Sequence, residues 1–131
     1  MNTRTFALIF GIVFLAVGAL GFVPSVVQNS TGDGLHQHGM LLGLFMISPL
    51  HNAAHLIFGL WGLAASRSTG GAVVYFKAVA VIYALLTVLG LIASTADLFG
   101  MIPLMGNDVY LHAALAIIAA YFGFVNRPRT A

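Results

Sequence analysis

Apolar residues fall into four long runs that are separated by shorter polar stretches. The first run, residues 6–23, contains no charged side chain. Since the hydrocarbon core of a bilayer is crossed by roughly 20 helical residues at about 1.5 Å each, this run is long enough to span it. The pattern predicts one domain over residues 1–131 with four membrane-spanning helices at about 5–23, 50–66, 72–96 and 108–125.

The connection between the first two predicted helices is the longest polar stretch before the third run. It opens with turn and loop residues and continues as a short apolar piece, Met40 to Ile47. Pro49 separates this piece from the second helix, because the residue before a proline is disfavoured in helical conformation. We therefore expect a re-entrant or interfacial segment here, and an all-α membrane protein in which four transmembrane helices form a bundle.

The composition agrees with a protein in a lipid bilayer. The chain is 60% hydrophobic and 6% charged, whereas soluble domains carry about 25% charged residues. No cysteine is present, which excludes disulfides, thiolate metal sites and cysteine nucleophiles. The five Lys and Arg residues are scattered along the chain, which argues against a nucleic acid partner.

The first run could also be read as a cleaved signal peptide, since Arg4 precedes an apolar stretch. The stretch is longer than the usual signal core of about 7–15 residues, so a retained helix is favoured.

With four spans, all basic residues fall on one side of the membrane and all acidic residues on the other. One side receives Arg4, Arg67, Lys77, Arg127 and Arg129, and the other receives Asp33, Asp97 and Asp108. The positive-inside rule makes the basic side cytoplasmic. The sequence thus predicts a multi-pass inner-membrane protein with both termini in the cytoplasm. Tyr75, Tyr110 and Tyr121 fall near predicted helix ends, as is typical of an interfacial aromatic belt.

Histidines and one acid gather at the predicted outer ends of two helices. His51 and His55 lie four residues apart and share a helix face, and Asp108 and His112 repeat this spacing on the last helix. Small residues continue both faces, and small residues let membrane helices approach closely. We expect these stripes to meet, forming a His/Asp pocket that Asn52, Asn107 and Asp97 support.

Two segments carry a family resemblance. SPLHNAAHLIFGLWGLAASR (48–67) and IPLMGNDVYLHAALAIIAA (102–120) resemble a bacterial family of small four-span membrane proteins, domain of unknown function 4383. The shared features are Pro49 to Leu56, Gly62 to Arg67, and Asp108 to His112. The resemblance implies a four-helix membrane fold in the bacterial inner membrane and carries no activity.

Several functions are compatible with this cluster of histidines and Asp108. As a structural feature, its imidazoles tie helices together, in a small structural or accessory membrane protein, a homo-oligomer or a subunit of a membrane complex. As a metal site, His51, His55, His112 and Asp108 supply nitrogen and oxygen ligands that suit Zn²⁺, Cu²⁺ or Ni²⁺. Two further alternatives are a single haem b held by histidines on opposed helices, and a pH response of the imidazoles.

An enzyme is the less favoured class. The zinc-hydrolase signature His-Glu-x-x-His has a glutamate as general base, and here Asn52 holds that position and takes up no proton. We name no catalytic residue.

Overall fold

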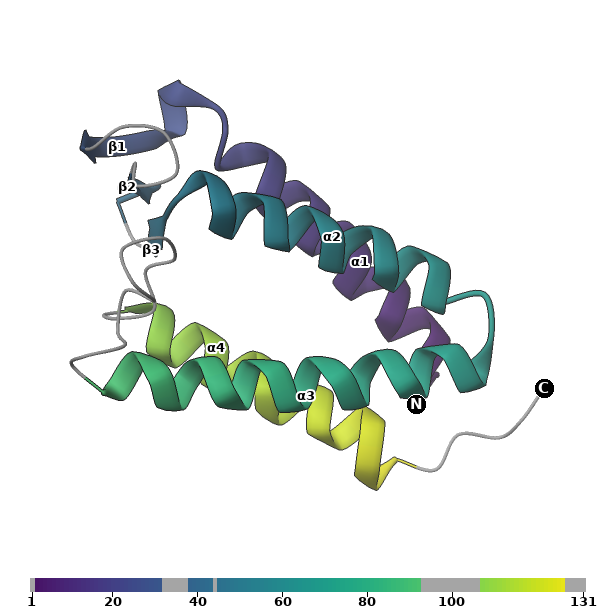
Figure 1. Ribbon diagram of the computed structural model, residues 1–131. Helices are drawn as coiled ribbons and strands as arrows, with labels where there is room; N and C mark the ends of the chain where they lie inside the picture. Colours follow the sequence, from purple (N-terminus) through teal and green to yellow (C-terminus); the bar gives the residue numbers. More distant parts are fainter. Residues whose placement is uncertain (1, 32–37, 44, 93–106, 127–131) are drawn as a thin grey trace.

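The computed structural model describes residues 2–31, 38–43, 45–92 and 107–126 (Figure 1). Its helices are α1 (Thr3–Leu20), α2 (Pro49–Ala65), α3 (Thr69–Leu91) and α4 (Asn107–Ala120). A 3-10 turn, η1 (Pro24–Val26), follows α1, and a π-helical turn, η3 (Tyr121–Val125), continues α4. The predicted spans 5–23, 50–66 and 108–125 begin and end within three residues of α1, of α2 and of α4 taken together with η3. The third helix begins three residues before the predicted position 72, and its predicted end at Ala96 lies outside the described residues.

Side-chain caps explain where three of the helices begin. The Asn2 side chain accepts a hydrogen bond from the Thr5 backbone N–H, and the Ser48 hydroxyl accepts one from the His51 N–H. Ser68 does the same for the backbone N–H of Gly71 at the start of α3. Such caps satisfy backbone donors that the first helical turn leaves free.

The helices are arranged as two hairpins, α1 beside α2 and α3 beside α4 (Figure 1). Glycines set the spacing within the first hairpin. A Cβ atom added to Gly62 would lie 2.9 Å from the Gly11 Cα, and one added to Gly11 would lie 2.9 Å from the Gly59 carbonyl oxygen. The two backbones touch, so this seam admits no side chain at these three positions.

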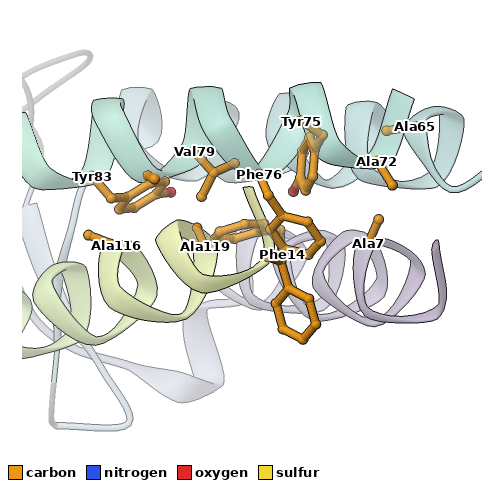
Figure 2. Close-up of a cluster of buried hydrophobic side chains, with 12 residues drawn as sticks. Ala7, Phe14, Ala65, Ala72, Tyr75, Phe76, Val79, Tyr83, Ala116 and Ala119 are labelled. Carbon is orange, nitrogen blue, oxygen red and sulfur yellow. The ribbon is translucent and has the colours of Figure 1, made fainter. Parts of the chain in front are cut away.

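Aromatic rings fill the space where the two hairpins meet (Figure 2). Phe10 of α1 packs edge-on against Phe76 of α3 with ring centroids 5.0 Å apart, and Phe76 stacks on Phe122 at 5.1 Å. Tyr75 is fully buried and its hydroxyl donates to the carbonyl oxygen of Phe58, at 3.0 Å. The prediction that Tyr75 belongs to an interfacial belt is therefore wrong, whereas Tyr110 is 77% exposed. A buried tyrosine needs a partner for its hydroxyl, and the α2 backbone supplies it.

Within the described residues, three helices are long and apolar enough to cross a membrane: Thr3–Leu20, Thr69–Leu91 and Asn107–Val125. Three of the four predicted spans are thus candidates by length and composition, whereas α2, with 17 residues, is not among these candidates. Large apolar side chains are exposed on all four helices, among them Ile12, Leu60, Val81 and Ile117. A chain with this much exposed apolar surface suits a lipid environment, which indicates a membrane protein.

The connection between α1 and α2 contains a small antiparallel sheet that the sequence analysis did not predict. Its strands are β1 (Val27–Thr31), β2 (His38–Leu41) and β3 (Phe45–Ile47), paired in the order β1-β2-β3. Leu42 and Gly43 after β2 both have positive φ, the backbone conformation that tight hairpin turns use. The all-α prediction is therefore correct for the helices and wrong for this segment, where the expected re-entrant or interfacial piece is a β-hairpin.

Candidate functional site

The start of α2 places polar side chains inside the molecule. Ser48, His51, Asn52 and His55 are all 5% exposed or less. Pro49 occupies the first helical turn and Ser48 caps it, so the chain turns sharply from β3 into α2 at this point. His51 and His55 then follow one turn apart on the buried face, with Gly59 and Gly62 continuing that face as the spacing predicted.

The three predicted histidines come together across the two hairpins. The His51 and His55 ring centroids are 4.5 Å apart, and the His51 ring lies edge-on to that of His112, 5.8 Å away. His112 is fully buried. His51 therefore touches both its neighbour on α2 and the last helix, and the contact between α2 and α4 that the sequence predicts is present.

Aromatic rings from the other two helices border this histidine cluster (His51, His55 and His112). Phe14 of α1 stacks on His55 with centroids 5.5 Å apart, and Tyr83 of α3 meets His112 edge-on at 5.2 Å. All four helices thus contribute a ring. The cluster lies at one end of the aromatic middle of the bundle.

Asn52 faces α1. Its backbone oxygen would lie 2.9 Å from a Cβ at Gly18, and its side-chain amide occupies the space that a Cβ at Gly21 would need. Asn52 therefore serves the α1–α2 contact, while its helix neighbours His51 and His55 serve the cluster.

Asp108 and Asn107, which the sequence predicts beside the pocket, differ in burial. Asp108 is fully buried in the first turn of α4, one turn before His112. Asn107 beside it is exposed and lies outside the buried group. Asp97 lies outside the described residues.

Several buried polar atoms have no hydrogen-bond partner within the described part of the chain. These atoms are Nδ1 of His55, both ring nitrogens of His112 and Oδ1 of Asn52. Such atoms are costly to bury, at about 1–3 kcal/mol each, unless water or an ion satisfies them. Within residues 2–31, 38–43, 45–92 and 107–126, however, no group of three or more His, Asp or Glu side chains is arranged to hold a metal ion.

A family model matches most of the chain. Residues 4–125 match the family described as Domain of unknown function (DUF4383). The chain belongs to the DUF4383 family. Both histidine helices of this DUF4383 protein lie within the matched range, which confirms the resemblance that these segments carry. No curated protein matches the chain, and no solved structure does.

The aromatic border of the cluster in this DUF4383 protein was not predicted. Phe14 follows Ala7 and Gly11 and precedes Gly18 on the buried face of α1, at helical spacing. This helical spacing could have indicated from the sequence that Phe14 lies on the buried face. The sequence pattern did not indicate that the Tyr83 ring of α3 contacts His112.

Proposed function

We propose that this DUF4383 protein crosses the membrane four times, with both termini on the cytoplasmic side. The support comes from α2 pairing with α1 along its whole length. At one end the Arg4 Nε donates to the Ser66 carbonyl oxygen at 2.9 Å, and at the other end Asn52 packs on Gly21. A helix that follows a spanning helix from end to end reaches the same depth.

The same pairing explains how a 17-residue helix suffices. At about 1.5 Å per residue α2 is about 25 Å long, and small mismatches are absorbed by local thinning of the bilayer. Ile57 and Leu60 are 65% and 61% exposed, which suits contact with lipid.

The protein's proposed role is structural or accessory: a compact membrane bundle whose histidine cluster fastens the α1–α2 hairpin to the α3–α4 hairpin at the outer end. The observation that carries this is the ring contact between His51 and His112, which joins residues 61 positions apart on the two hairpins. Ring pairs of this kind contribute about 0.5–1.5 kcal/mol beyond the area they bury. Such a bundle would act through a second copy or another membrane protein.

Binding of a transition metal is the second candidate function. It is favoured by the buried ring nitrogens of His55 and His112 that have no hydrogen-bond partner within the described part of the chain. His51, His55, His112 and Asp108 form a donor set that suits Zn²⁺, Cu²⁺ or Ni²⁺. In the described structure the rings stack and tilt on one another, so metal binding would require the imidazoles to rotate.

One experiment separates the two functions. Purified tag-free protein is stripped with chelator, and its thermal unfolding in detergent is followed with and without Zn²⁺, for wild type, His55→Ala and Tyr110→Phe. The structural role predicts that His55→Ala lowers the unfolding temperature equally in both conditions. Tyr110→Phe, which removes an exposed hydroxyl from the first turn of α4, should match wild type.

A wild-type unfolding temperature that rises with Zn²⁺ through mass action, together with loss of this rise in His55→Ala, would establish metal binding instead. An unfolding temperature that His55→Ala leaves unchanged without metal would contradict the structural role.

A further inference from the structure

An open pocket of about 410 Å³ lies at the opposite end of the bundle from the histidine cluster. It is formed where α1 begins and α2 ends. The lining residues are Asn2, Arg4, Thr5, Leu8, Ser66 and Arg67. We propose that this pocket binds the phosphate of an anionic lipid headgroup in the cytoplasmic leaflet.

Charge is the first reason. Arg4 and Arg67 bring two guanidinium groups to one pocket, and both side chains are exposed. Across the described residues the single acidic side chain is Asp108, which is buried in the first turn of α4 at the other end. No carboxylate of the described structure therefore neutralises this pair, and arginine is well matched to phosphate through its paired N–H groups.

The hydrogen bonding at the pocket leaves donors available. Arg4 uses its Nε to bind the Ser66 carbonyl oxygen, at 2.9 Å. This bond holds the Arg4 side chain across the pocket. It also satisfies the Ser66 carbonyl oxygen, whose partial negative charge would otherwise repel an anion. The terminal nitrogens of Arg4 stay available, and the N-terminal end of α1 adds a partial positive charge.

The apolar wall of the pocket distinguishes a lipid from a free anion. Leu8, one turn into α1 from Arg4, lines the pocket and is 41% exposed. Ile12, one turn further along α1, is 55% exposed. An acyl chain attached to a phosphate in the pocket would run along these side chains, whereas inorganic phosphate would gain nothing from them.

The position of the pocket relative to the membrane also agrees with an anionic lipid. Under the proposed topology, on which this inference rests, the pocket faces the cytoplasmic headgroup region, where anionic lipids concentrate. Basic pockets beside membrane helices on that side are a recognised kind of lipid site.

The test is native mass spectrometry of the full chain in nonionic detergent, with phosphatidylglycerol and phosphatidylcholine of the same acyl chains as probes. We expect wild type to bind phosphatidylglycerol more tightly. Arg67→Gln should weaken that binding about fivefold, the effect of one cation near an anionic lipid surface, and leave phosphatidylcholine binding unchanged. Within the described residues the Arg67 side chain makes no hydrogen bond, so this variant should fold, which Arg4→Gln would not guarantee because the Arg4 side chain binds the Ser66 carbonyl.

Lys77→Gln is the matched control, because it removes one exposed cation that lies over Phe124 and outside the pocket. Equal weakening by Lys77→Gln and Arg67→Gln would overturn the site in favour of a general effect of charge. Displacement of phosphatidylglycerol by an equal concentration of inorganic phosphate would overturn the lipid assignment. Because binding is measured on solubilised folded protein, its failure would leave the four-span topology and the histidine cluster untouched.

Discussion

The middle of the bundle and the end that holds the histidine cluster, which is the outer end in the proposed topology, are both buried, yet their packing chemistry is opposite. In the middle, Phe76 and Phe122 fill the space with rings that require no partner, and the buried hydroxyl of Tyr75 donates to the Phe58 carbonyl oxygen. At the outer end, His55 and His112 are equally buried and carry nitrogens that the described residues leave without hydrogen bonds.

This difference suggests that the fold depends on the apolar packing of the middle and only tolerates the buried imidazoles at the other end. Apolar packing alone would close the outer end at least as well, since replacing buried polar groups by apolar groups of similar shape is often neutral or stabilising. A cluster of imidazoles at that place is therefore the feature of the molecule that packing explains least. The following predictions test how far the two regions differ, from the largest expected effect to the smallest.

The aromatic middle should be the most sensitive region. Phe76→Ala should lower the free energy of unfolding by about 3 kcal/mol, the low end of the usual range because the unfolded helices stay in apolar surroundings. Thermal or denaturant unfolding in detergent measures this. Phe22→Ala removes the same ring at a site that is 52% exposed, and should change stability by less than about 0.5 kcal/mol. Similar losses in both variants would mean that the middle is not a packed core.

The glycine seam of the first hairpin should come next. Gly62→Ala places a methyl group 2.9 Å from the Gly11 Cα, so the two backbones must separate, at a cost of about 2 kcal/mol. Gly70→Ala adds the same methyl group where nothing lies within 4 Å. It should be neutral or raise stability by up to about 1 kcal/mol, because alanine favours the helix. Equal unfolding temperatures for the two variants would contradict the close contact of α1 and α2.

The sequence predicted the small-residue seams and the histidine positions, because helical spacing alone puts such residues on one face. Small residues continue the buried face of α2 after His51 and His55, at Gly59 and Gly62, and the rings of His51 and His112 lie beside each other. The aromatic middle was not predicted, because an aromatic residue is equally suited to lipid, to an interface and to a core. Tyr75 shows this: its place near a helix end suggested a belt, and the Phe58 carbonyl that satisfies its hydroxyl lies 17 residues away.

The sheet between α1 and α2 escaped prediction for a related reason. Its strands are three to five residues long, and a three-residue strand such as Phe45–Ile47 has too few positions to show alternation. The turn after β2 also places Leu42 at positive φ, a conformation that its residue type does not announce.

At the outer end, substitution should have a smaller effect whose sign depends on the replacement. His112→Ala leaves a cavity beside His51 and Tyr83 but removes two unpartnered nitrogens, so we expect a net loss of about 1 kcal/mol. His112→Leu fills most of the space and should be neutral or stabilising. Unfolding of both variants in detergent gives the comparison. A loss of several kcal/mol in His112→Leu would show that the ring nitrogens have partners that matter.

The smallest effect should come from the hydroxyl in the aromatic middle. Tyr75→Phe removes the hydrogen bond to the Phe58 carbonyl and keeps the ring, so stability should fall by about 0.6 kcal/mol, the average for such bonds between membrane helices. Tyr110→Phe, at a tyrosine that is 77% exposed, is the control and should be silent. A Tyr75→Phe protein as stable as wild type would show that this hydrogen bond does not contribute to stability.

The contact between His51 and His112 is the most direct test of how the two hairpins are joined. A double-mutant cycle with His51→Ala, His112→Ala and the double variant, unfolded in detergent with chelator present, measures their coupling. The account predicts a coupling of about 0.5–1 kcal/mol that added Zn²⁺ does not change. Additive effects in chelator would contradict it, and a coupling that emerges only with Zn²⁺ would make the cluster a metal site.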